Sequence, residues 1–256
     1  MDATRRGFLG AVGRVTIGAA ASVAGASQSA GAAGAAPDDS GHRPHWGMVV
    51  DLRKCIGCQA CTVACIMEND VPEDAFRTHV SVYELVKDGQ DPAMVMLPRL
   101  CNHCDNPPCL PVCPVEATFK AENGEVLVDA SKCVGCAYCV QACPYDARFI
   151  NHETQTADKC TFCFHRTSVG LLPACVETCV GGARNFGDLN DPDSEVSRML
   201  RDNEVSVLRP EMHTNPNVYY IGLDDVLDGR VAGEAAYHAE MVAGPGHDAA
   251  QHGEGL

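Results

Sequence analysis

Aromatic residues and long apolar runs are both scarce in this sequence. Phe, Tyr and Trp make up 5% of the 256 residues, so a large hydrophobic core of the usual kind is not expected. No stretch is long and apolar enough to span a bilayer, so any attachment to a membrane would have to come through another subunit.

Basic residues and nucleotide-binding motifs are scarce as well. The chain has 19 Lys and Arg against 34 Asp and Glu, and its net charge of −15 argues against nucleic acid or an anionic membrane surface as a partner. It has no Gly-x-Gly-x-x-Gly after a strand and no P-loop. No Ser/His/Asp set can be proposed either, so the chain is not expected to be an enzyme on its own.

Cysteine, in contrast, is abundant, and its distribution organises the chain. All sixteen cysteines lie in four runs of four: CIGCQACTVAC (55–65), CNHCDNPPCLPVC (101–113), CVGCAYCVQAC (133–143) and CTFCFHRTSVGLLPACVETC (160–179). Sixteen thiolates are the number that four [4Fe–4S] clusters require, with none left over. No cysteine is then free to act as a nucleophile, and the residues favour electron transfer.

The spacing within the runs indicates how the clusters are held. Cysteines at i, i+3 and i+6 supply three ligands of one cluster, and the fourth cysteine of the run ligates a different cluster, as in two-cluster bacterial ferredoxins. Two runs have this spacing, and the other two widen the second gap. Disulfides and zinc are the alternatives. Cysteines three apart in tight loops are poorly placed to pair, and zinc leaves the third and fourth cysteine of each run unexplained.

The residue after each run suggests which runs share clusters. Cys113 and Cys143 precede proline, as in two-cluster ferredoxins, whereas Cys65 and Cys179 do not. Our hypothesis therefore pairs the two inner runs with each other and the two outer runs with each other. It gives a first set of ligands (Cys55, Cys58, Cys61, Cys179), a second set (Cys160, Cys163, Cys175, Cys65), a third set (Cys101, Cys104, Cys109, Cys143) and a fourth set (Cys133, Cys136, Cys139, Cys113).

Four more residues are predicted to tune the clusters. Lys54, Lys132 and Lys159 each precede the first cysteine of a run, where positive charge favours a reduced cluster. A solvated lysine at the end of a strand is the alternative. His103 lies between Cys101 and Cys104, where it would hydrogen-bond a cluster sulfur or sense pH, unless it is an ordinary packed or surface histidine.

The N-terminal segment has the pattern of an export signal. Thr4-Arg5-Arg6-Gly7-Phe8-Leu9 is a twin-arginine motif, and an Ala/Gly/Val-rich stretch follows it to about residue 36. Clusters are assembled inside the cell, so a protein that carries them must cross the membrane already folded. The sequence therefore predicts a place on the periplasmic side of the cytoplasmic membrane, held there by a partner.

Two of the runs are related by an internal repeat. VDLRKCIGCQACTVAC (50–65) and VDASKCVGCAYCVQAC (128–143) are identical at nine of sixteen positions, which predicts a duplicated ferredoxin module. Hydrophobic patterns and turn residues predict the remaining elements. Strands are expected over 47–52, 79–86, 94–97, 125–128, 205–208 and 218–223, and helices over 62–67 and from Ser194 to about residue 202.

The predicted fold class is α+β, with two ferredoxin-like [4Fe–4S] lobes, short β insertions and a C-terminal extension. The expected boundaries are a signal peptide over 1–36, a linker over 37–45, an outer lobe over 46–99 and 153–189, an inner lobe over 100–152, the extension over 190–232 and a disordered tail over 233–256.

Three segments resemble the four-cluster iron–sulfur subunits of the DMSO-reductase family of respiratory molybdoenzymes. They are RLCNHCDNPPCLPVCPVEATFK, CVGCAYCVQACPYDARFINHETQTADKCTFCFHR and GLLPACVETCVGGAR, and the resemblance covers about residues 46–225. Some members replace one cysteine and hold a [3Fe–4S] cluster. All sixteen cysteines are present here, so the resemblance implies four [4Fe–4S] clusters.

The resemblance also implies partners and a reaction. A membrane subunit that oxidises quinol would supply electrons near the inner runs, and a molybdopterin catalytic subunit would receive them near the first set. The segments are most similar to members that serve tetrathionate reductases, which implies reduction of tetrathionate to thiosulfate in anaerobic respiration. Members that serve polysulfide, thiosulfate, DMSO or arsenate reductases share much of this sequence, and a free periplasmic ferredoxin is a further alternative.

Overall fold

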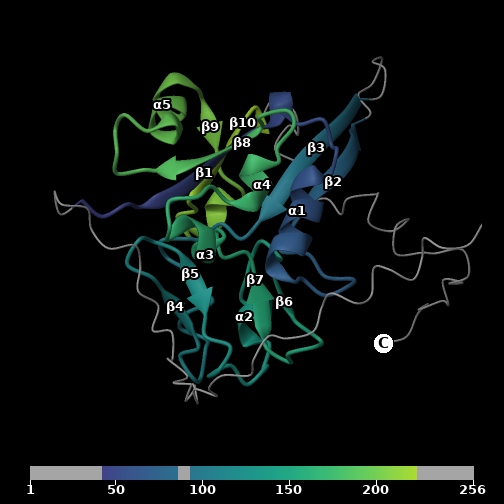
Figure 1. The fold of residues 1–256 in the computed structure, drawn as a ribbon, viewed down its shortest axis with the longest axis vertical. Helices are drawn as coiled ribbons and strands as arrows, with labels where there is room; N and C mark the ends of the chain where they lie inside the picture. Colours follow the sequence, from purple (N-terminus) through teal and green to yellow (C-terminus); the bar gives the residue numbers. More distant parts are fainter. Residues whose placement is uncertain (1–41, 86–92, 224–256) are drawn as a thin grey trace, which may run out of the picture. The chain divides into compact units, whose positions relative to one another are not determined.

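The computed structural model describes residues 42–85 and 93–223, which form ten strands, five α-helices and two 3₁₀ helices (Figure 1). The strands are β1 (Trp46–Asp51), β2 (Thr78–Leu85), β3 (Ala93–Leu100), β4 (Thr118–Lys120), β5 (Val126–Val128), β6 (Arg148–Ile150), β7 (Ala157–Lys159), β8 (Arg184–Asp188), β9 (Val205–Ser206) and β10 (Val218–Ile221). The helices are η1 (Leu52–Lys54), α1 (Ala60–Asn69), α2 (Tyr138–Gln141), α3 (Phe164–Thr167), α4 (Ala174–Glu177), α5 (Glu195–Asp202) and η2 (Pro210–Met212).

A four-stranded sheet joins segments from both ends of the described sequence. Its strand order is β8-β1-β10-β9. β1 pairs antiparallel with β8, where Met48 lies opposite Phe186, and parallel with β10, where Val50 lies opposite Tyr220. The first run of cysteines follows β1, so this sheet fixes the position at which the run begins.

The two faces of the sheet pack against different parts of the chain. Side chains alternate between faces along a strand, so Val49 and Ile221 pack on one side with Val196 of α5. Met48, Val50 and Tyr220 lie on the other side, in a core that includes five buried cysteines. The sheet therefore shields the cysteine-bearing loops on one face and is covered by α5 on the other.

The other strands form three antiparallel hairpins. β2 pairs with β3, and Val82 lies opposite Met96. β4 pairs with β5, and β6 pairs with β7, in short ladders of three residues. In Figure 1 the β4–β5 and β6–β7 hairpins and α2 lie together, apart from the four-stranded sheet. The β6–β7 hairpin ends at Lys159, directly before the fourth run.

The internal repeat extends to the backbone. Gly57 and Gly135 have φ values of 69° and 68°, and Gln59 and Ala137, two residues later, have 59° and 61°. Positive φ is costly for residues with a Cβ, so glycine suits the first position. The left-handed residue that follows turns each loop into a helix, α1 or α2. The same local sequence thus folds in the same way at both places.

Most predicted elements are confirmed. The strands expected over 47–52, 79–86, 94–97 and 125–128 correspond to β1, β2, β3 and β5, and both helices are present as α1 and α5. The last two strands are shorter than expected, because β9 has two residues and β10 ends at Ile221. The expected signal peptide and tail lie outside the described residues.

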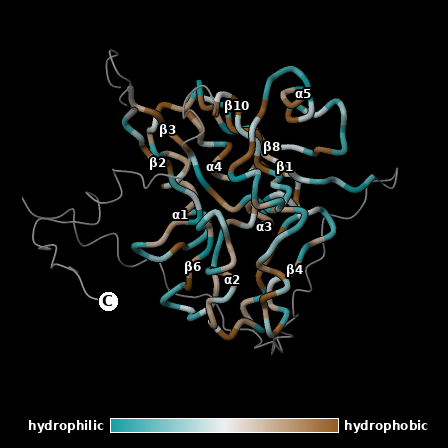
Figure 2. Tube along the Cα trace, turned by 180° about the vertical axis from the view of Figure 1, so that it is seen from behind, coloured by the Kyte–Doolittle hydropathy of each residue, from teal (hydrophilic) through white to brown (hydrophobic). Residues whose placement is uncertain are grey.

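Polarity is finely mixed along the chain. Figure 2 shows short hydrophobic stretches that alternate with hydrophilic ones throughout the described part. Among the described residues, no helix is long and apolar enough to cross a membrane. The mixed helix and strand content agrees with the predicted α+β class.

Candidate metal centres

The cysteines differ in exposure in a regular way. Cys58 and Cys136, the second cysteines of the two repeated runs, are exposed. In the first set and in the fourth set, one other cysteine is buried and two are half-buried. All four cysteines of the second set are buried, and so are three of the third set. The chain therefore presents two partly exposed sets and two enclosed ones.

The second set lines one enclosed cavity. Cys65, Cys160, Cys163 and Cys175 all contribute to its wall, together with apolar residues that include Phe162. Burial raises the pKa of Cys65 to about 12, and the neighbouring Cys175 and Cys163 thiols act in the same direction. Without metal the Cys65 thiol would be protonated at neutral pH, so cluster binding there must release a proton.

Thiols within the third set influence one another, and so do thiols within the first set. Burial raises the pKa of Cys104 to about 12, and the thiols of Cys101, Cys109 and Cys143 add to the increase. Burial likewise raises the pKa of Cys55, and the thiols of Cys61 and Cys179 contribute. The first group consists of the four cysteines predicted as the third set, and the second group of three cysteines predicted for the first set, and both sets stay predictions.

Cys113 is the member of the fourth set that comes from another run. Burial alone would raise the pKa of Cys113, but hydrogen bonds from Thr118, Val115 and Ala117 outweigh it, and the pKa is lowered. The other three members share one loop of the repeat. The place of Cys113 beside them stays a prediction.

Neighbouring sets lie close together in a fixed order. The Cys61 thiol of the first set influences Cys175 of the second, and Cys101 of the third influences Cys160 of the second. Cys109 of the third set and Cys139 of the fourth are buried in the same small core. If the predicted sets are correct, their order along the molecule is first, second, third, fourth.

Backbone N–H groups point at the cysteine sulfurs. The N–H of Ala117 donates to Cys113 Sγ at 3.2 Å, that of Ala183 to Cys179 Sγ at 3.2 Å, and that of Ala157 to Cys133 Sγ at 3.3 Å. Such N–H donors stabilise negative charge on sulfur and are one of the factors that set cluster potentials. The cysteine sets and their donors thus fit [4Fe–4S] clusters.

Single metal ions fit less well. Within the described part of the chain, no three His, Cys, Asp or Glu side chains come close enough to share one ion. Ligands of a multi-iron cluster stand further apart than ligands of one ion, since each binds a different iron.

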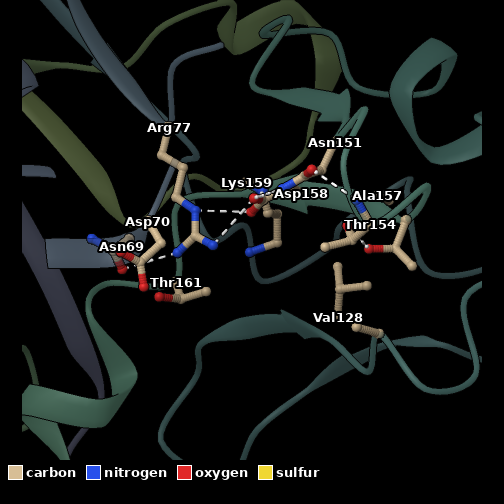
Figure 3. A pocket seen from close by; sticks show the side chains of 12 residues that line it. Asn69, Asp70, Arg77, Val128, Asn151, Thr154, Ala157, Asp158, Lys159 and Thr161 are labelled. Carbon is tan, nitrogen blue, oxygen red and sulfur yellow. Dashed lines mark hydrogen bonds and ion pairs between the residues drawn. The ribbon is translucent and has the colours of Figure 1, made fainter. Parts of the chain in front are cut away.

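A polar pocket lined by Asn69, Arg77 and Asp158, among others, lies beside the second set (Figure 3). Asn69, at the end of α1, points its amide nitrogen at Cys65 Sγ (3.6 Å) and Cys163 Sγ (3.8 Å). Arg77 donates to Asn69 Oδ1 (2.9 Å) and pairs with Asp158 of the β6–β7 hairpin (2.8 Å). Arg77 therefore fixes the orientation of the amide toward the sulfurs.

The three lysines predicted to tune clusters have different environments. Lys54 and Lys132 are exposed and pair with Asp51 and Asp129, at 3.9 and 3.5 Å. Lys159 is 1% exposed, and its ammonium donates to the carbonyl oxygens of Val126 and Cys160. Burial lowers the pKa of Lys159 despite the nearby Cys101 thiol. Tuning by these lysines stays a prediction, and burial favours Lys159.

His103 is fully buried. Its ring stacks on Phe162, with ring centroids 3.7 Å apart, and Nδ1 accepts the backbone N–H of Val126 at 3.0 Å. Burial and the charges of Lys159 and Arg148 hold the pKa of His103 well below its ordinary value. The ring is thus neutral at physiological pH, and cluster tuning by it stays a prediction.

Two buried arginines were missed by the sequence reasoning. Arg148 and Arg184 each lie five residues after the last cysteine of a run, in the pattern C-x-x-x-A-R. They are 4% and 3% exposed. The repeated pattern could have identified them.

The fold and the cysteine sets together define an iron–sulfur protein of the ferredoxin type. A family model of the 4Fe–4S dicluster domain matches residues 92–189, and a second such model matches residues 54–117.

Known relatives extend this similarity to most of the chain. A tetrathionate reductase subunit of Salmonella typhimurium is 55% identical over 92% of this chain and 94% of its own length. A tetrathionate reductase subunit of Archaeoglobus fulgidus is 46% identical over 70% of this chain and 82% of its own. A putative dimethyl sulfoxide reductase iron–sulfur subunit of Halobacterium salinarum is 37% identical over 81% and 95%. The chain belongs to this family of iron–sulfur electron-transfer subunits of reductases.

Proposed function

We propose that the chain holds four [4Fe–4S] clusters and relays electrons within a tetrathionate reductase complex. The observation that carries this proposal is the order of the cysteine sets, with two enclosed sets between two that reach the surface. A relay needs an entrance and an exit at the surface and carriers between them.

Each cluster, when bound, would accept and pass on one electron. The cysteines hold the clusters in order, and the buried side chains around them exclude water from the second and third sets. Low exposure strengthens electrostatic interactions, so nearby N–H donors and cations act strongly there. The relay role agrees with a subunit that is not an enzyme on its own.

The exposed sets are proposed as the places where partners dock. Ile56 (63% exposed) and Val180 (74%) flank the first set, and Val134 (64%) and Tyr138 (57%) flank the fourth. Exposed apolar residues gathered beside exposed ligands are typical of interaction surfaces. We propose a molybdopterin catalytic subunit at the first set and a quinol-oxidising membrane subunit at the fourth.

The substrate is proposed from the relatives. Two of them, from a bacterium and an archaeon, are named as subunits of tetrathionate reductase. The similarity to the Salmonella protein covers nearly the whole of both chains. Relatives that serve dimethyl sulfoxide and selenate reductases are less similar, at 37% and 39% identity.

A capture experiment tests this function. The chain is isolated from detergent-solubilised membranes, its partners are identified, and oxidation of reduced viologen is followed with tetrathionate, thiosulfate and polysulfide in turn. A molybdenum subunit that prefers tetrathionate supports the proposal. A molybdenum subunit with another preference retains the relay and changes the substrate, and a lone four-cluster chain favours a diffusing ferredoxin.

The ligand sets are tested by one pair of variants. Cys179→Ser is expected to damage the cluster held by Cys55, Cys58 and Cys61, and Cys113→Ser the one held by Cys133, Cys136 and Cys139. Spectra of the individual reduced clusters distinguish the four. If Cys179→Ser changes only the cluster bound by Cys160, the proposed sets are wrong.

We also propose the two-lobed organisation and the export of the chain. The matching φ values of the two repeated loops support a duplicated module. β10 pairs with β1, so the proposed C-terminal extension completes the sheet of the proposed outer lobe. The twin-arginine motif supports a location on the periplasmic side of the cytoplasmic membrane. A double variant, Arg5→Lys with Arg6→Lys, should leave the protein inside the cell, and normal periplasmic levels would contradict export.

A further inference from the structure

Two buried arginines occupy equivalent positions in the two halves of the cysteine arrangement. Arg148 begins β6 and Arg184 begins β8, each five residues after a cysteine. Each guanidinium donates to a threonine that begins another strand. For Arg148 the acceptor is Thr118 of β4 (3.2 Å), and for Arg184 it is Thr78 of β2 (2.7 Å).

Arg148 lies between the third and fourth sets. Its guanidinium donates to Cys109 Sγ at 3.0 Å. Burial lowers the pKa of Arg148, but the thiols of Cys109, Cys101 and Cys139 outweigh it and raise the pKa above its ordinary value. Cys109 and Cys101 belong to the third set, and Cys139 belongs to the fourth.

Arg184 lies beside the second set, because its hydrogen-bond partners Thr78 and Met48 both line the cavity that this set lines. Burial lowers the pKa of Arg184, but the thiols of Cys175 and Cys61 outweigh it and raise the pKa. Cys61 belongs to the first set and Cys175 to the second. The Nε atom of Arg184 is buried and finds no hydrogen-bond partner among the described residues.

The hydrogen bonds of both arginines go to groups other than carboxylates. Their partners are threonine hydroxyls and sulfur atoms, Cys109 Sγ for Arg148 (3.0 Å) and Met48 Sδ for Arg184 (4.0 Å). A buried charge is costly unless it is paired with an opposite charge. The negative charge that compensates these guanidinium groups must therefore come from the cysteine sets and what they bind.

We propose that Arg148 and Arg184 are electron-transfer residues, each a fixed positive charge shared by two successive clusters. The proposal rests on the four-cluster function above. Arg184 stabilises the reduced forms of the first and second clusters, and Arg148 those of the third and fourth. Each arginine thereby holds the potentials of its two clusters higher than they would be without it.

The charge balance is simple. Reduction of a cluster adds one electron, and thus one negative charge, to a buried site. The guanidinium retains its protons throughout, because its pKa lies above any physiological pH. No bond forms or breaks. The electron comes from the preceding carrier and passes to the next one. While the electron is on a cluster, the arginine lowers the electrostatic energy of that reduced cluster.

Lys159 differs from the two arginines. It lies near Cys160 of the second set and Cys101 of the third, but burial lowers its pKa.

The test is a redox titration of the intact complex, followed by electron paramagnetic resonance of the reduced clusters. Iron and acid-labile sulfide are measured first, and the unmodified chain should contain four irons and four sulfides for each of four clusters. Fewer clusters in the unmodified chain would contradict the four-cluster function and not the role of the arginines.

Arg184→Gln is expected to shift two of the four midpoint potentials to more negative values, those of the first and second clusters. Arg148→Gln should shift the other two. Unchanged potentials in variants that retain all four clusters would overturn the proposal, and so would a shift of all four together.

Two further variants separate charge from structure. Arg184→Lys retains the charge and should retain near-normal potentials, while Thr78→Val removes the hydrogen-bond acceptor and should not reproduce the shift. If Arg184→Gln fails to assemble clusters, the lysine variant decides. Assembly with normal potentials supports a role for charge, and loss of clusters in Arg184→Lys too assigns the arginine a structural role only.

Discussion

The four-stranded sheet and the two short hairpins protect their cysteines by different means. The sheet region (β1, β8, β9 and β10 with β2, β3 and α5) has many buried apolar side chains, among them Met48, Leu97 and Tyr220. The hairpin region (β4–β7 with α2) has a core of four buried residues: Cys109, Val126, Cys139 and Ala157. Half of that small core is cysteine.

The hairpin region therefore depends on the clusters for its folding more than the sheet region does. A core of two apolar side chains and two thiols buries little surface, so it contributes little hydrophobic stability. Bound metal then supplies folding free energy, as in other small metal domains. The sheet region has an ordinary core in addition to its ligands. The two regions should therefore respond differently to the same change.

Removal of iron should produce the largest difference in stability between the two regions. With a chelator under reducing conditions, the hairpin region is expected to lose most of its protection against amide hydrogen exchange, while strands of the sheet retain much of theirs. Exchange followed by mass spectrometry measures both in one sample. Equal loss in β1 and β5 would show that the apolar core gives the sheet no independent stability.

A matched pair of core variants is the next largest test. Val50 in β1 is 0% exposed and Val126 in β5 is 1% exposed, so truncation to alanine removes the same buried atoms. Val50→Ala should cost roughly 2 kcal/mol of unfolding free energy in the sheet region. Val126→Ala should lower the unfolding free energy of the hairpin region by less while clusters are bound, since the clusters supply most of the stability of that region.

Amide exchange in each region gives the two costs separately. The comparison fails if the Val126 variant opens the hairpins of the cluster-loaded protein as much as the Val50 variant opens the sheet.

Acidification should affect the two copies of the repeat to different extents. Asp51 is 1% exposed and pairs with Arg53 through two hydrogen bonds (2.8 and 2.9 Å), and its equivalent Asp129 is partly exposed and accepts from Ser131. The hydrogen bond from Arg53 lowers the pKa of Asp51 despite burial, and the one from Ser131 lowers that of Asp129.

A lowered pKa in the folded state stabilises the fold above the ordinary carboxyl pKa, and this stability is lost as the pH falls through the folded value. Asp51→Asn should therefore cost about 1 kcal/mol at neutral pH, because Arg53 is itself more than half exposed to solvent. The cost should vanish in acid. Asp129→Asn should cost less. Denaturant titrations at several pH values, with cluster absorbance followed in parallel, give both curves.

The smallest expected effect concerns α5, which covers the face of the sheet that points away from the cysteine-rich core. Ser194 caps this helix by accepting the N–H of Ser197 at 3.1 Å. Ser194→Ala should cost about 1 kcal/mol, seen as faster exchange within Glu195–Asp202, and Ser194→Asp should restore the cap. A change in cluster spectra in the alanine variant would contradict the view that α5 stabilises the sheet alone.

The sequence was most informative where the structure is local. Cysteine spacing, the repeated loops around Gly57 and Gly135 and the helix start at Ser194 each involve neighbours in the chain, and each was predicted. β4, β6 and β7 have three residues, too few for a recognisable alternation, and were missed, whereas β5 is equally short but follows the Asn123-Gly124 turn and was predicted. The parallel pairing of β1 with β10 joins residues about 170 apart and has no local signal.

The surroundings of the sites were harder to predict than the ligands. Lys54, Lys132 and Lys159 occupy the same position relative to a run, yet only Lys159 is buried. Tertiary packing decides this, and no local pattern encodes it. Arg148 and Arg184 were missed because charged residues are usually exposed, although the repeated C-x-x-x-A-R pattern marks both.

The position of β1 in the sheet has a consequence for the order in which the protein matures on the ribosome. β1 is synthesised early, but its neighbours β8 and β10 emerge late among the described strands. With the proposed ligand sets, all ligands of the third and fourth clusters lie within Cys101–Cys143 and are available midway through synthesis. The first and second sets must wait for residues up to Cys179 and for the strands that enclose them. Iron is therefore expected to enter the sites of the third and fourth sets first, and those of the first and second sets only after the strands that enclose them have been synthesised.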